Sequence, residues 1–178
     1  MQFTKDSFYM ELRQRLAALN PQRTVTLNGS VRPAIIVPEN EVVTAAEPLA
    51  ECFHLYWGSA KVIKRQSGGA APMMALECAI AYRSAGSNDA STDRGRRLAA
   101  LDEELLTISR PYSAPKRDYA QSPSTDLGTS IYWNDPELGQ IDVLGDQPPS
   151  TWRRSRNGQG SRLLRVVNLT IFFFPEVS

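Results

Sequence analysis

Residues 162–174 read Arg-Leu-Leu-Arg-Val-Val-Asn-Leu-Thr-Ile-Phe-Phe-Phe, and this stretch decides the fold. It is rich in β-branched and aromatic residues and contains neither glycine nor proline, so it predicts one long strand. Apolar residues occupy both the odd and the even positions. We therefore expect the strand to lie inside a sheet that is covered on both faces.

A second long strand is predicted over residues 73–83. One face of this strand carries Met74, Leu76, Cys78, Ile80 and Tyr82. The other face is mostly small, with Ala75, Ala79 and Ala81, and this predicts a helix packed closely against it. We expect residues 75–82 and 166–173 to share one layer of the fold.

Two helices are predicted. The first runs from a cap at Asp6 or Ser7 to about Leu19, and it ends before Pro21. Its apolar stripe is formed by Phe8, Leu12, Leu16 and Leu19. The second helix runs from about Asp93 to Ser109, and Leu98, Leu101, Leu105 and Ile108 mark its buried side. We expect Asp102, Glu103 and Glu104 to face solvent on this helix, in company with Arg94 and Arg97.

The remaining pattern predicts short strands and long connections. Asn28-Gly29 lies between extended runs at 24–27 and 31–37, which is a strong hairpin signal. Further short strands are predicted at 53–57, 131–133 and 141–144, and long loops near 58–72, 110–129 and 145–161. The prediction is a single α+β domain over residues 1–178, with a central, mostly antiparallel sheet flanked by two main helices.

Composition excludes few partners. The chain has 178 residues, 42% of them hydrophobic, and a formal net charge of +1, so global electrostatics favour no particular ligand. No stretch resembles a signal peptide or a membrane-spanning segment, so we expect a cytoplasm-like environment and no membrane contact. The two cysteines, Cys52 and Cys78, are expected to be reduced and buried, although a disulfide between them stays open.

Residues capable of catalysis are sparse. His54 is the only histidine, and the sequence supplies no evident carboxylate or nucleophile to work with it. One histidine cannot complete a common zinc set with two distant cysteines. Gly68-Gly69 and Gly158-Gln-Gly160 match no phosphate-binding loop. We expect no catalytic, metal or cofactor site, and no enzymatic activity.

The sharpest charge feature is an arginine-rich segment at residues 153–165. It contains Arg153, Arg154, Arg156, Arg162 and Arg165, and Trp152 precedes it. Such a segment could contact phosphates while the tryptophan stacks on a base, which would make the chain a small nucleic-acid-binding accessory protein. Asp135, Glu137, Asp142 and Asp146 precede the segment, so a basic loop facing an acidic loop of another subunit is the favoured alternative.

The order of elements resembles that of the tail terminator and tail-completion (neck) proteins of tailed bacteriophages. The resemblance is carried by Asp6-Ser-Phe-Tyr-Met-Glu-Leu-Arg-Gln-Arg-Leu16, by Leu76-Glu-Cys-Ala-Ile-Ala-Tyr82 with the helix that follows, and by Arg165-Val-Val-Asn-Leu-Thr-Ile-Phe-Phe173. It covers most of the chain in outline and includes no signature motif.

This resemblance implies a homo-oligomeric ring, expected to be a hexamer, that caps the tail tube and meets the head-side connector. A sheath protein is a possible further partner, and nucleic acid would be present only as DNA passing through the ring lumen. The protein would be assembled in the host cytoplasm and reside in the virion tail or neck.

The composition suits such an assembly. Interfaces favour Arg, Tyr and Trp over Lys, and this chain has sixteen Arg against four Lys. We expect loops rather than the sheet to make the contacts between subunits. The expected interface residues are Trp152, Arg153, Arg154, Arg156, Tyr112 and Tyr119.

Overall fold

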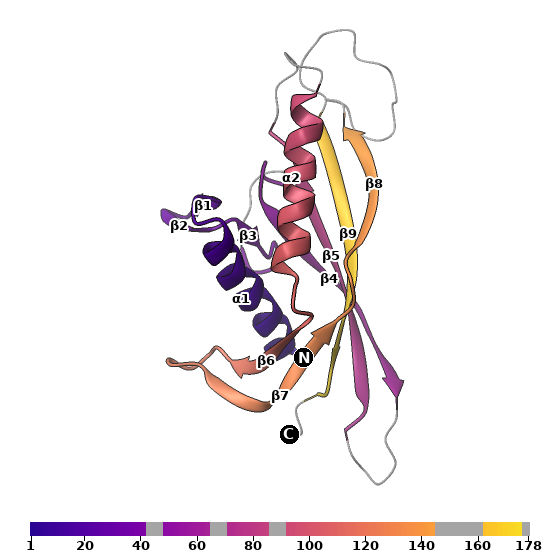
Figure 1. Ribbon diagram of the computed structural model, residues 1–178. Helices are drawn as coiled ribbons and strands as arrows, with labels where there is room; N and C mark the ends of the chain where they lie inside the picture. Colours follow the sequence, from indigo (N-terminus) through magenta and orange to yellow (C-terminus); the bar gives the residue numbers. More distant parts are fainter. Residues whose placement is uncertain (42–47, 65–70, 86–91, 145–161, 176–178) are drawn as a thin grey trace.

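The computed structural model describes residues 1–41, 48–64, 71–85, 92–144 and 162–175 (Figure 1). Its elements are, in order, α1 (Gln2–Leu19), β1 (Thr24–Leu27), β2 (Ser30–Pro33), β3 (Ile35–Ile36), β4 (Phe53–Lys64), β5 (Met73–Arg83), α2 (Asp93–Ile108), β6 (Ser113–Asp118), β7 (Thr125–Trp133), β8 (Glu137–Leu144) and β9 (Arg162–Phe173). The long loop predicted at residues 145–161 lies outside the described residues.

The two long predicted strands lie side by side at the centre of the sheet. β5 and β9 are antiparallel and stay in unbroken register from Met74 opposite Phe173 to Arg83 opposite Leu164. This confirms that residues 75–82 and 166–173 share one layer. Because these partners lie about 90 residues apart in the chain, their pairing encloses α2 and every strand from β6 to β8.

Around this pair, the strands follow the order β3-β4-β5-β9-β7-β6, and β8 also pairs with β9. All these pairings are antiparallel except the short contact of β3 with β4. β7 and β8 pair with successive parts of the same side of β9, since Trp133 faces Ile171 and Glu137 faces Asn168. The observed α+β architecture, with two helices and a mostly antiparallel sheet, confirms the predicted fold class.

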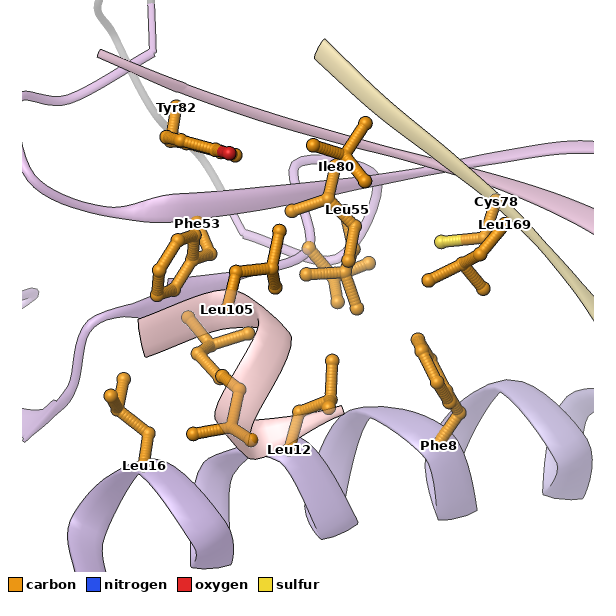
Figure 2. Close-up of a cluster of buried hydrophobic side chains, with 14 of the residues drawn as sticks. Phe8, Leu12, Leu16, Phe53, Leu55, Cys78, Ile80, Tyr82, Leu105 and Leu169 are labelled. Carbon is orange, nitrogen blue, oxygen red and sulfur yellow. The ribbon is translucent and has the colours of Figure 1, made fainter. Parts of the chain in front are cut away.

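Both helices cover the same face of the sheet, and this corrects two expectations. Figure 2 shows Leu55, Cys78, Ile80 and Leu169 directed from the sheet toward α1 and α2. On β9, the odd positions Val167, Leu169, Ile171 and Phe173 are buried, whereas the even positions from Leu164 to Phe172 are half-buried or exposed. Among the described residues no helix covers the second face, so the predictions of a two-sided cover and of a helix on the alanine face of β5 were wrong.

The size of the side chains explains which face the helices choose. The large residues of β5 meet the leucines of α1 and α2 in one continuous core. Phe8 of α1 packs edge-on against Trp57 and Trp133, with ring centroids 6.2 and 5.1 Å apart. Each large side chain buried in this way contributes about 1.5–3 kcal/mol, which the alanine face cannot offer.

α1 begins earlier than predicted. It starts at Gln2, with Met1 as its N-cap and no side-chain cap. Ser7 lies inside the helix, fully buried, where its hydroxyl accepts a hydrogen bond at 2.9 Å from the backbone N–H of Arg117. Ser7, one of the two residues expected to cap the helix, therefore links α1 to β6 through this hydrogen bond.

Two predicted loops contain strands. β4 continues through Lys64, so residues 58–64 are extended and pair with β5. Residues 110–129 include β6 and the first half of β7, which pair with each other. Both segments have weak local strand propensity, and their pairing partners impose the conformation. In contrast, the predicted hairpin at Asn28-Gly29 is confirmed, since both residues have positive φ (49° and 78°) between β1 and β2.

A buried polar cluster ties α2 to the sheet, and Asp102 is its centre. The carboxylate of Asp102 accepts hydrogen bonds from the Arg165 guanidinium at 3.1 and 2.7 Å and from the Tyr82 hydroxyl. Arg165 also donates to the carbonyl of Gly139 at 2.7 Å. At Gly139 a Cβ would lie 2.4 Å from the carbonyl oxygen of Val166, so only glycine lets β8 approach β9 this closely. One cluster thus joins α2, β5, β8 and β9.

Removing the carboxylate of Asp102 should be costly, because it leaves the Arg165 guanidinium largely buried without its counter-ion. We expect Asp102→Ala to lower the free energy of unfolding by about 3 kcal/mol and Tyr82→Phe by about 1 kcal/mol. Urea unfolding followed by circular dichroism measures both. Lys61→Ala is the matched control, since the side chains of the Lys61–Glu77 ion pair are 63% and 50% exposed and its loss should cost less than about 1 kcal/mol. Equal losses for Asp102→Ala and Lys61→Ala would contradict this role of the cluster.

Candidate interaction surface

The only histidine has a structural environment. His54 is buried on β4, and its Nε2 accepts a hydrogen bond from the backbone N–H of Leu49 at 2.9 Å. Burial lowers the pKa of His54 to about 4, and the positive charge of Arg83 acts in the same direction, while Glu41 opposes them. The imidazole is therefore neutral near pH 7, and it holds the segment before β4 against the sheet.

The acidic residues of α2 are not a solvated face. Glu104 is nearly buried, and its carboxylate accepts hydrogen bonds from the Asn20 side chain at 2.8 Å and from Arg23 at 2.9 Å. Asp102 is equally buried in the cluster described above, and only Glu103 is exposed. The expectation that all three face solvent was wrong for Asp102 and Glu104, because α2 is flanked by the sheet on one side and by the end of α1 on the other.

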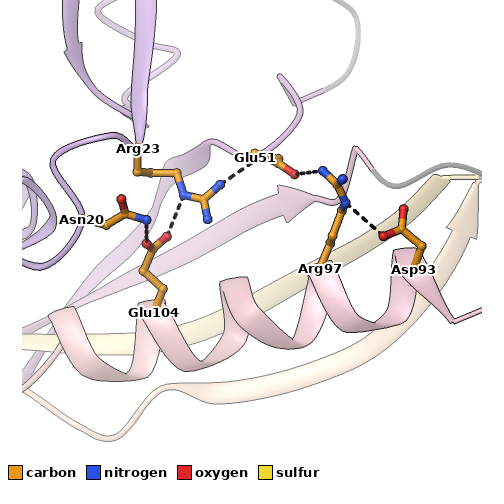
Figure 3. Close-up of polar contacts among 6 residues, drawn as sticks. All are labelled: Asn20, Arg23, Glu51, Asp93, Arg97 and Glu104. Carbon is orange, nitrogen blue, oxygen red and sulfur yellow. Dashed lines mark hydrogen bonds and ion pairs between the residues drawn. The ribbon is translucent and has the colours of Figure 1, made fainter.

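A chain of ion pairs continues from Glu104 along α2 (Figure 3). Arg23 bridges Glu104 and Glu51, and Glu51 in turn lies 3.4 Å from Arg97. Arg97 also pairs with Asp93 one turn earlier on the same helix, at 3.3 Å. These charges connect the end of α1, the segment before β4 and α2, so they position elements of the fold.

The cysteines are buried and free. Burial raises the pKa of the Cys52 thiol to about 11, and burial likewise raises the pKa of Cys78. A thiol with a raised pKa is a weak nucleophile near neutral pH. In the part of the chain that the structure describes, no three His, Cys, Asp or Glu side chains gather in a way that could hold a metal ion.

Only two of the predicted interface residues are among the residues that the structure describes. Trp152, Arg153, Arg154 and Arg156 lie outside the described residues. Tyr112 and Tyr119 are described, and both are half-buried. They precede and follow the six residues of β6, so their backbones lie roughly 20 Å apart and do not form one aromatic patch.

Each tyrosine already has neighbours. The hydroxyl of Tyr112 accepts a hydrogen bond from Arg110 at 2.9 Å, and its ring packs against the main core. Burial raises the pKa of Tyr119, and the positive charge of Arg117 opposes this shift.

The face of the sheet opposite the helices has a shallow groove of about 400 Å³. Its lining includes Tyr56, Gly58, Glu77, Ala79, Glu137 and Asn168. The Glu77 carboxylate accepts a hydrogen bond from the Ser59 hydroxyl at 3.0 Å and lies 3.5 Å from the Lys61 ammonium group. The carboxylates of Glu77 and Glu137 therefore line the same groove, although they belong to strands that are distant in the sequence.

Exposed apolar side chains concentrate on two strands, and the sequence analysis missed them. Of nine exposed large hydrophobic residues among those described, five lie on β4 or β8, namely Tyr56, Val62, Ile63, Leu138 and Ile141. The adjacent β-branched pair Val62-Ile63 was a usable signal, but it lay within a segment expected to be a loop. Exposed apolar patches of this kind are typical of interaction surfaces.

Comparisons with known proteins add no family to this picture. No protein-family model matches the chain, and no curated protein matches it significantly. Neither helix among the described residues combines the length and apolar character that crossing a membrane requires.

The environment of His54 predicts a dependence of stability on pH. Because its folded-state pKa of about 4 lies below the ordinary value of 6.5, the unfolded chain binds more protons between these limits. The stability that His54 contributes is complete above pH 6.5 and is lost as the pH falls toward 4, by roughly 3 kcal/mol in all. Urea unfolding at half-unit steps from pH 7.5 to pH 4 measures this slope. His54→Gln, which keeps an acceptor but cannot titrate, should flatten it, and an unchanged slope in this variant would contradict the assignment.

Proposed function

We propose that this chain is a structural, non-enzymatic assembly protein of a tailed bacteriophage. It acts as a tail terminator, or a closely related neck component, that forms a homo-oligomeric ring. The ring caps the tail tube, stops its growth and offers a surface to the head-side connector. DNA would pass through the lumen of the ring.

The observation that carries this proposal is the one-sided sheet. Among the described residues no helix covers the second face of the sheet, where Tyr56 and Tyr132 are exposed, and assembly with other subunits buries such side chains. The roles of the buried polar residues also support a structural, non-enzymatic protein. His54, Asp102 and Glu104 are engaged in hydrogen bonds or ion pairs that hold the fold together.

The ring is tested with the purified chain and the tail-tube protein encoded in the same genome. We expect annular particles in negative stain and a single oligomer larger than a dimer by light scattering. Adding the chain to polymerising tube protein should shorten the tubes, because a bound ring blocks the growing end. A chain that stays monomeric at high micromolar concentration, with tube protein present, would refute the proposal.

The rival function is nucleic-acid binding through the arginine-rich segment. Arg165 is unavailable for this role, because its guanidinium is held by Asp102 and by the carbonyl of Gly139. The rival therefore depends on Arg153, Arg154 and Arg156.

Salt titration of DNA binding separates the two functions. If the chain is an assembly protein, changing Arg153, Arg154 and Arg156 to Ala should alter affinity for duplex or single-stranded DNA by less than about threefold at physiological salt. A loss of affinity of about a hundredfold in this triple variant, together with a steep decline of wild-type binding as salt rises, would favour the nucleic-acid function.

A further inference from the structure

We infer that neighbouring copies of this chain join through the edges of their sheets, with the free part of β4 in one copy pairing with β8 in the next. This contact deepens the proposed ring by naming the surface that builds it, and in that sense it rests on the proposed function. It assigns the subunit contact to strands, whereas the sequence alone pointed to loops.

The first surface is the far half of β4. β3 pairs with β4 only at Phe53 and His54, so among the described residues no strand lies beside Trp57–Lys64 on that side. Unpaired N–H and C=O groups along a strand edge are a template for another strand. Val62 and Ile63 are 48% and 44% exposed there, which gives the edge an apolar surface to bury.

The second surface is the outer edge of β8. β8 pairs with β9 alone within the described part of the chain, so its other edge carries no strand. Leu138 and Ile141 are 42% and 47% exposed on this strand. Both surfaces are therefore strand edges with exposed apolar side chains and no neighbouring strand among the described residues. They lie on opposite sides of one sheet.

Charge makes the two edges complementary. The free part of β4 carries Lys61 and Lys64 and no acidic residue, whereas β8 carries Glu137 and Asp142 and no basic residue. Two β4 edges would repel each other, and so would two β8 edges, while β4 against β8 is attractive. Lysines on an edge strand disfavour pairing with most other strands. An acidic strand can pair there because its charges are opposite.

Strand direction also fits. Going across the sheet, β4, β5, β9 and β8 alternate in direction at every step. β4 and β8 therefore run in opposite directions. When copies follow one another in the same orientation, β8 of one copy lies antiparallel to β4 of the next. The alternation continues through the contact, and the joined sheets form one antiparallel array with a head-to-tail interface.

The two edges are offset along the strands, and this constrains the assembly. Glu137 lies level with Tyr56 across the sheet, through Asn168 and Ala79. From there β8 runs away from the free half of β4, toward the opposite end of the sheet (Figure 1). Adjacent copies must be staggered, so a closed ring requires strands inclined to the ring axis, as they are in β-barrels. Without that inclination the same contact would repeat as an open helix.

Charge reversal on each edge tests the contact. One variant carries Lys61→Glu with Lys64→Glu, and the other carries Glu137→Lys with Asp142→Lys. The first has two acidic edges and the second two basic edges, so each should self-associate at least about tenfold more weakly than the wild type by analytical ultracentrifugation. An equimolar mixture should recover wild-type assembly, because every contact then joins unlike edges. Glu103→Lys, on the exposed side of α2, is the control and should assemble normally.

Several outcomes would overturn the inference. They are normal assembly of either variant, loss of assembly in the control, or failure of the mixture to recover when both variants keep the wild-type urea midpoint. If a double change lowers that midpoint, Lys64→Glu and Glu137→Lys alone repeat the same comparison.

The contact and the proposed function fail in different ways. Variants that assemble normally and still cap tail tubes would refute the edge contact and leave the tail-terminator role intact. Rescue by mixing without any effect of the assembled protein on tube length would support the contact and refute that role. In negative stain, closed annuli fit both proposals, whereas open filaments fit the contact alone.

Discussion

The antiparallel pairing of β5 with β9 is the constraint on which the rest of the structure depends. It joins a mid-chain strand to the last strand through ten consecutive residue pairs. The elements between β5 and β9 in the sequence, from α2 to β8, must then be accommodated in a chain segment whose two ends are held together. α2 packs over the pair, and β7 and β8 occupy the other side of β9 in succession. Because β9 follows all the other elements in the sequence, the core is complete only when β9 is in place.

Charged residues reinforce this arrangement from inside. Asp102 connects α2 with β5 and β9 through Tyr82 and Arg165, and Glu104 connects α2 with the end of α1 through Asn20 and Arg23. A buried carboxylate is costly to desolvate unless it is paired and hydrogen-bonded, and both carboxylates are. Their geometry specifies how α2 is rotated on the sheet, since a shift along or around its axis would separate these partners.

The cover of helices on a single face has the largest consequence for function. Leucines and aromatic rings fill the space between helices and sheet, while the opposite face carries exposed Tyr56, Glu77 and Asn168 around a groove. Most of the exposed large apolar residues lie on β4 and β8, and each of these strands has an edge without a neighbouring strand among the described residues. In the proposed assembly these edges supply the surface that is buried, and their complementary charge would orient one copy against the next.

Elements whose signal is local could be predicted from the sequence. Runs rich in apolar residues and free of glycine and proline predicted β5 and β9, apolar stripes predicted both helices, and Asn28-Gly29 predicted the β1–β2 turn, because periodicity and turn chemistry depend on near neighbours. Tertiary structure decided which face of β5 the helices cover, and whether Ser7 caps a helix or binds β6. It also decided that residues 58–64 and 125–130 are strands, since partners distant in sequence impose that conformation on weak formers. The burial of Asp102 and Glu104 and the exposure of Val62 and Ile63 belong to the same class, because a residue's exposure is set by what packs against it, and a linear pattern does not contain that information.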